Sequence, residues 1–211
     1  LSGDPDYLSH PGIDGNVLDD LIIESQSPVA GGTVDLGIIS NVGSLFDLDT
    51  TGHGGTVNAE LRADQNPGDQ WVFDNAGSGT LNLTIFGSAS ADSFDGTNTF
   101  YGASFTGDGT TTNSLTFNNV NLTLDGVVDF SQVDNLVFGA GTTIAVALGA
   151  TLTLTVEQAL DIALNGPAIT GEGTIVVTGD YDDTHQALGH DLGTNLRTAF
   201  LDFSGVNMTG T

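Results

Sequence analysis

The residues of this chain that could do chemistry are carboxylates gathered in loops rich in glycine and polar residues. Calcium takes about six to eight oxygen ligands from carboxylates, backbone carbonyls and water, and Asp and Asn in such loops can supply them. The alternative is a solvated turn, in which the Asp side chain hydrogen-bonds to its own backbone. The candidate calcium ligands are Asp4, Asp6, Asp14, Asn16, Asp19, Asp20, Asp92, Asp95, Asp180, Asp182 and Asp183.

Other reactive groups are less specific. His185 and His190 lie among acidic residues and could ligate zinc, but their H-x4-H spacing matches no standard metal motif, which favours an exposed polar loop. A glycosidase needs a pair of carboxylates, and no spacing here singles out a pair. The patterns G-x-S-x-G and G-K-[ST] are absent. We therefore expect a protein that is not an enzyme, with a β-helix enzyme acting on polysaccharide as the alternative.

A few aromatic residues could bind a ligand by stacking. Trp71, Phe100 and Tyr101 could form a platform for a neutral glycan or a partner protein. Aromatic residues more often fill a core, so a buried role is the alternative.

The charge balance is extreme. The sequence has 27 acidic and two basic residues, with a net charge of -25 and no lysine. Such a chain repels nucleic acid and anionic membrane surfaces, because binding phosphates requires Lys and Arg. It attracts cations, and bound Ca²⁺ would offset the repulsion between carboxylates. Ca²⁺ is therefore the expected cofactor.

The composition also bears on location. There is no cysteine, which excludes disulfides and thiolate metal sites. No run of 18 apolar residues exists, so we expect no membrane insertion. Abundant Asp, Gly and Thr fit a secreted or cell-surface protein. The sequence begins at Leu1 without a basic segment, so any signal peptide is already removed or the sequence is a piece of a longer chain.

The elements that must position these residues are short strands. Residues 1–32 are turn-rich and acidic and are expected to form a loop or linker. Residues 33–126 form an N-terminal β region, and residues 127–211 continue it. Segments such as GTLNLTIFG alternate apolar with polar residues, which is typical of β-strands. Residues 156–164 are the one candidate helix, and a turn that carries Leu160 and Ile162 inward is the equal alternative. The fold class is all-β: a right-handed parallel β-solenoid or β-roll, with β-sandwich modules as the alternative.

A repeated phrase favours the solenoid. VVDFSQV at residues 127–133 returns as FLDFSGV at residues 200–206, an offset of 73 positions. The segments 129–136, 149–158 and 171–179 read D-F-S-Q-V-D-N-L, G-A-T-L-T-L-T-V-E-Q and G-E-G-T-I-V-V-T-G. Residues 127–179, with a restart at 201, resemble the β-strand repeats of large RTX-like and S-layer-like bacterial surface adhesins. No intact G-G-x-G-x-D nonapeptide is present.

That resemblance implies an extracellular structural protein, often dependent on calcium. We expect a self-assembling building block of a surface layer, filament or adhesin. The partners would be copies of the chain or further repeats of the same chain, with a cell-surface glycan as a second possibility. The alternative is an adhesin-type module that binds a neutral glycan or a host protein.

Overall fold

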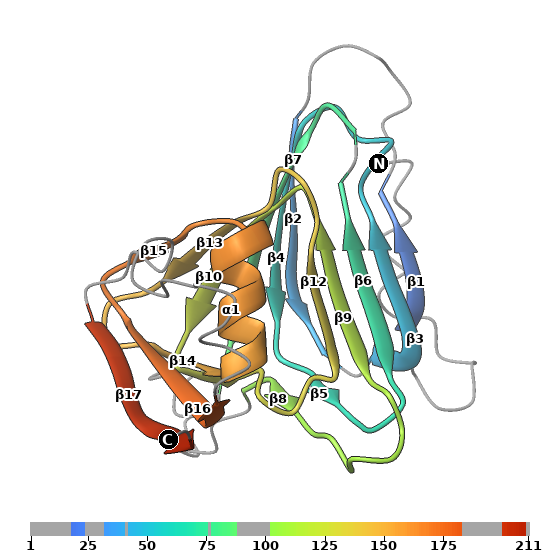
Figure 1. Ribbon diagram of the computed structural model, residues 1–211. Helices are drawn as coiled ribbons and strands as arrows, with labels where there is room; N and C mark the ends of the chain where they lie inside the picture. Colours follow the sequence, from blue (N-terminus) through green and yellow to red (C-terminus); the bar gives the residue numbers. More distant parts are fainter. Residues whose placement is uncertain are drawn as a thin grey trace, which may run out of the picture.

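The computed structural model describes residues 18–23, 32–40, 42–75, 77–87, 102–182 and 200–209. Every strand pairing among these residues is parallel. Consecutive strands up to β16 lie in different sheets, so the chain winds from one sheet to the next (Figure 1). This confirms the parallel β-solenoid and excludes the sandwich, whose sheets are antiparallel.

Three sheets carry most of the strands. Sheet 1 contains, in pairing order, β1 (Leu18–Ile22), β3 (Val42–Asp49), β6 (Gln70–Asp74), β9 (Ser114–Asn118) and β12 (Asn135–Phe138). Sheet 2 contains β15 (Ile169–Gly171), β13 (Thr143–Val146), β10 (Val120–Asp125), β7 (Thr80–Phe86), β4 (Thr56–Leu61) and β2 (Thr33–Ile39). Sheet 3 contains β11 (Val127–Asp129), β14 (Thr151–Thr155), β16 (Thr174–Asp182) and β17 (Phe200–Thr209), and a separate pair is formed by β5 (Asp64–Gln65) and β8 (Ser104–Phe105).

Sheet 2 gives the period of the solenoid. Each turn contributes one strand to this sheet, so its six strands mark about six turns. Partner residues on neighbouring strands of sheet 2 are 22 to 25 positions apart in the sequence. The turn from β7 to β10 is longer, since Leu81 pairs with Val120. That turn contains residues 88–101, which lie outside the described residues.

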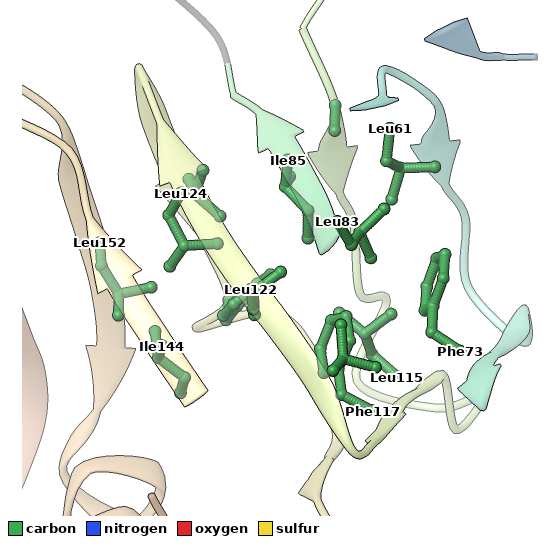
Figure 2. Packing of buried hydrophobic residues seen from close by; sticks show 14 of the residues in the cluster. Leu61, Phe73, Leu83, Ile85, Leu115, Phe117, Leu122, Leu124, Ile144 and Leu152 are labelled. Atoms are coloured by element: carbon green, nitrogen blue, oxygen red, sulfur yellow. The ribbon is translucent and has the colours of Figure 1, made fainter. Parts of the chain in front are cut away.

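The core consists of rows of like side chains that repeat from turn to turn. Side chains alternate along a strand, so the polar–apolar alternation of the sequence places every second residue inside. In sheet 2, Leu61, Ile85, Leu124 and Val146 occupy one register row and are all fully buried. Figure 2 shows Leu61, Ile85 and Leu124 of this row, together with Phe73 and Phe117 of sheet 1. The solenoid is therefore filled by side chains and has a continuous apolar interior.

Aromatic rings reinforce the interior behind sheet 1. Phe73 stacks on Phe117 with 5.4 Å between ring centroids, and Phe117 stacks on Phe138 at 5.5 Å. The interplanar angles are 13° and 9°, so the three rings lie nearly parallel. Parallel, in-register strands impose this arrangement because equivalent residues sit directly above one another.

Polar residues hold the corner between sheets 1 and 2. The Asn75 amide donates to the Gly79 carbonyl at 3.0 Å and accepts from the Thr50 hydroxyl at 3.1 Å. Asn119 has a left-handed φ of 55° and donates to the Asn75 carbonyl at 2.6 Å. These bonds satisfy the backbone where the chain leaves the sheets, which is where buried polar groups would otherwise remain unpaired.

Helix α1 (Val156–Asn165) confirms the candidate helix at residues 156–164. It begins with a capping box between Thr155 and Gln158. The Gln158 amide also donates to the carbonyls of Phe130 and Val133, both at 2.8 Å, which ties the helix to the previous turn. α1 follows β14 of sheet 3 and precedes β15 of sheet 2, which is the position that sheet-1 strands take in earlier turns.

The acidic segment 1–32 contains one described strand. Residues 18–22, expected to form loop or linker, make β1 at the edge of sheet 1. The single alternation Leu21 and Ile23 is too short to be recognised as a strand in the sequence.

The stacked core gives a direct test of the fold. We expect Leu124→Ala to lower the free energy of unfolding by about 2 to 5 kcal/mol, because it removes buried methyl groups from the middle of a row. Urea denaturation measures the change. Leu148→Ala is the matched control, since Leu148 is 78% exposed at a turn, and it should change stability by less than about 0.5 kcal/mol. Equal effects of the two substitutions would contradict the stacked core.

Candidate functional surfaces

The outer face of sheet 2 carries a row of polar side chains that bind one another. Asn58 donates to Asp35 at 2.6 Å, Asn82 donates to Asn58 at 2.9 Å, and Asn121 donates to Asn82 at 3.1 Å. The Thr143 hydroxyl donates to Asn121 at 3.0 Å and ends the row. We call this row the polar ladder. The side chains of the ladder hydrogen-bond to one another, and the carboxylate of Asp35, its one charged member, accepts a bond from an amide.

The outer face of sheet 1 contains a different arrangement, which we call the acidic grid: Asp20, Asp47, Asp49 and Asp74. Asp20 on β1 pairs in register with Asp47 on β3, and Asp49 on β3 pairs in register with Asp74 on β6. Neighbouring strands lie about 4.8 Å apart, so these carboxylates face like charges across the sheet. The grid concentrates negative charge on three adjacent strands.

Asp47 is the most perturbed member of the grid. One carboxylate oxygen, Oδ1, is buried and has no hydrogen-bond partner. Burial raises the pKa of Asp47 above its ordinary value, and the charges of Asp49, Asp20 and Asp74 raise it further. The sequence signal for this grid is the alternation S-L-F-D-L-D, which places Asp47 and Asp49 on one face of β3. This alternation alone does not predict the grid, because the partners of Asp47 and Asp49 on β1 and β6 depend on the register.

Carboxylates elsewhere act in turns. Asp108 accepts hydrogen bonds from the backbone N–H groups of Thr110 at 2.8 Å and Thr111 at 2.7 Å. These bonds lower the pKa of Asp108 to about 2. Asp129 accepts a hydrogen bond from the Ser131 N–H at 2.9 Å. The solvated-turn alternative therefore applies to these two residues, which use the carboxylate to close the backbone.

Only some of the predicted calcium ligands can be placed. Asp19 and Asp20 are adjacent on β1, where successive side chains point to opposite sides. Asp180 and Asp182 lie in β16. Within the described ranges, no group of three or more His, Cys, Asp or Glu residues is arranged to hold a metal ion. The calcium site stays a prediction, because the remaining residues lie outside the described ones: Asp4, Asp6, Asp14, Asn16, Asp92, Asp95 and Asp183, as well as His185 and His190.

Trp71 belongs to the core. Its side chain is fully buried, and its indole Nε1 donates to the Gly43 carbonyl at 3.0 Å. Its ring meets Phe46 and Phe105 edge to face, at centroid distances of 6.5 and 6.3 Å. This corrects the prediction of Trp71 as a ligand-stacking residue, since a buried ring offers no face to a sugar. Phe100 and Tyr101 lie outside the described residues.

The repeated phrase occupies equivalent positions in sheet 3. Val127, Thr151, Thr174 and Phe200 are successive register partners on β11, β14, β16 and β17. In the same way, Asp129 of the first phrase and Asp202 of the second lie in one register row. The offset of 73 positions therefore corresponds to three turns on one sheet. After this row the two copies differ, because β11 ends at Asp129 and β17 continues to Thr209.

Sheet 3 ends on a long edge strand. β17 covers ten residues and pairs with β16, and within the described part of the chain it is the last strand of sheet 3. An edge strand presents a row of backbone N–H and C=O groups that can pair with another strand. This edge is therefore a candidate surface for adding a strand.

Comparisons with protein-family models, curated proteins and solved structures find no match to this chain. Among the described residues, no helix has the length and apolar character needed to cross a membrane.

The acidic grid predicts how stability depends on pH. The folded state raises the pKa of Asp47, so it holds that proton more tightly than the unfolded state does. The contribution of Asp47 to stability is therefore fully present below the ordinary Asp value of about 4 and is lost as the pH rises through the raised pKa. We expect Asp47→Asn to stabilise the protein at pH 7 by about 0.5 kcal/mol, after solvent screening. Thermal melts from pH 7 to pH 4 should show this advantage shrinking as wild-type Asp47 becomes protonated.

Asp108 supplies a control of opposite sign. Because its folded pKa is lowered, its contribution is present above the ordinary Asp value of about 4 and is lost as the pH falls toward 2. Asp108→Asn should therefore lower the melting temperature at pH 7. If only the net charge of the protein mattered, Asp47→Asn and Asp108→Asn would both be stabilising. That result would contradict the opposite effects expected for the two carboxylates.

Proposed function

We propose that this chain is a non-enzymatic structural building block of an extracellular surface assembly, and that it associates with copies of itself or with further repeats through the edges of its sheets. The observation that carries the proposal is the register of the repeated phrase. Residues 200–202 of β17 lie in the same rows of sheet 3 as residues 127–129 of β11, so the opening of the repeated phrase recurs on one sheet after three turns. A strand added to β17 would then meet the same kind of edge that β14 meets on β11.

The surfaces support association rather than catalysis. The polar ladder of sheet 2 uses its amides and hydroxyl on one another. The described aromatic candidate, Trp71, is in the core. A regular stack with open sheet edges grows by adding further strands, as solenoids do.

The charge supports a location outside the cell and a role for cations. A lysine-free chain with a net charge of -25 has little attraction for nucleic acid or anionic lipid. Copies of such a chain repel one another unless salt or bound cations reduce the repulsion. The resemblance of residues 127–179 to bacterial surface repeats points in the same direction. We therefore propose a secreted or cell-surface protein whose assembly depends on ionic conditions.

Self-association tests the proposal. We expect wild-type protein to form oligomers or filaments as NaCl or CaCl₂ is raised, as measured by sedimentation velocity and electron microscopy. Val206→Pro and Asn207→Pro form a matched pair, because consecutive N–H groups of a strand point to opposite sides and proline removes one of them. At the position whose N–H points away from β16, proline removes a donor from the free edge and should reduce association with little change in melting temperature. At the position whose N–H points toward β16, proline removes a bond between the two strands and should destabilise β17.

Protein that stays monomeric across both titrations would refute the proposed assembly. If both proline variants still associate, the contact between copies does not involve the edge of β17. Both outcomes can be measured at a single protein concentration, because the melting temperature distinguishes a variant that fails to fold from one that folds but does not associate.

Calcium is tested separately. Extracellular sites bind Ca²⁺ with dissociation constants of about 0.1 to 1 mM, so about 10 mM Ca²⁺ would stabilise the folded state by about 1.4 to 2.7 kcal/mol per site. For a chain of this size we expect the melting temperature to rise by about 3 to 10 °C per site. NaCl at the same ionic strength and MgCl₂ at the same concentration are the controls. An equal rise of the melting temperature in all three salts would mean that charge screening explains the effect, and it would refute the calcium site.

A further inference from the structure

Within residues 19–23, whose side chains the structure describes, two apolar side chains attach the strand β1 to the interior of the solenoid. Ile23, just after the strand, is 7% exposed, and Leu21 packs against the core while remaining partly exposed. Ile22 points outward and is 62% exposed. The Ile23 N–H donates to the Asp49 carbonyl at 2.8 Å, so the attachment continues to the end of the strand. β1 is thus an edge strand with a small hydrophobic contribution.

The charge repulsion within the acidic grid opposes this hydrophobic contribution. Docking β1 brings Asp20 into register with Asp47, beside Asp49 and Asp74 of the next two strands. The buried and unpartnered Oδ1 of Asp47 adds to the cost. The described arginine, Arg62, is engaged elsewhere, since it lies over the Phe86 ring and 3.5 Å from Glu60. Docking of β1 therefore increases like-charge repulsion. Burial is the main cause of the raised pKa of Asp47, and the charges of Asp49, Asp20 and Asp74 raise it further.

The equivalent edge of sheet 2 provides an internal comparison. β2 is also an edge strand, and its Asp35 is in register with Asn58 of β4. There the carboxylate accepts an amide hydrogen bond at 2.6 Å instead of facing a second carboxylate. The two edges thus differ in what faces the carboxylate of the edge strand: a second carboxylate on sheet 1 and a neutral amide on sheet 2.

We propose that β1 is an ionically gated strand, docked on β3 when salt screens the acidic grid and released when salt is low. Release transfers the edge of sheet 1 from β1 to β3. The gate requires no bound metal, because screening of the grid is sufficient, and it is independent of the assembly proposed above.

Hydrogen–deuterium exchange at constant pH tests the gate. Wild-type protein is compared in about 10 mM and about 1 M NaCl, where the Debye length is about 30 Å and about 3 Å. We expect the amides of residues 18–23 to exchange about tenfold faster at low salt, corresponding to about 1.4 kcal/mol, while those of β2 change little. In Asp47→Asn, residues 18–23 should exchange slowly at both salt concentrations, because the central charge of the grid is gone.

Asp161→Asn is the matched control, since it removes one charge from the exposed side of α1, where Asp161 accepts a hydrogen bond from Asn165. It should leave the salt dependence of residues 18–23 unchanged. The proposal is overturned if these amides respond to salt no more than those of β2 do. It is also overturned if Asp161→Asn protects them as well as Asp47→Asn does, because the effect would then arise from net charge and not from the grid.

Discussion

The structure depends on in-register stacking of parallel turns. Strands about 4.8 Å apart place each side chain directly over its equivalents in the turns before and after. Each residue must therefore pack well against residues of the same type. Leucine and phenylalanine meet this condition inside the solenoid, where Leu124 and Phe117 are fully buried. Outside, the same condition distinguishes amides from carboxylates. An amide can both donate and accept along a row, whereas a carboxylate can only accept.

The polar ladder and the acidic grid are two results of that single rule. On sheet 2 the row from Asp35 to Thr143 needs only one charged member, because the amides pass hydrogen bonds from strand to strand. On sheet 1, Asp20 meets Asp47 and Asp49 meets Asp74, so repulsion accumulates on the strands near the N-terminal end. Among the described strands, the carboxylates of this highly acidic protein are thus unevenly placed, with like charges in register on sheet 1.

The sequence predicts most of the strands and favours the solenoid over the sandwich, because alternation and turn residues are local signals, but it does not predict β1. It also places helix 156–164, where Thr155 and Gln158 form a recognisable capping box. It is insufficient for the grid, because the pairing of Asp49 with Asp74 requires the register, and turn lengths are unequal where Leu81 pairs with Val120. For a similar reason the sequence leaves Trp71 open between a stacking platform and the core, because the segment QWVFD does not say which face is inside until the neighbours Phe46 and Phe105 are known.

Helix α1 has a consequence for geometry. It occupies the position of a sheet-1 strand after β12, while sheets 2 and 3 continue through β15 and β17 (Figure 1). The two extremities of the described solenoid are therefore chemically unlike: one begins with strands of sheets 1 and 2, and the other offers strands of sheets 2 and 3 beside a helix. Units of this kind joined end to end would make heterologous contacts, and the resulting fibre would have a direction, with distinguishable leading and trailing tips.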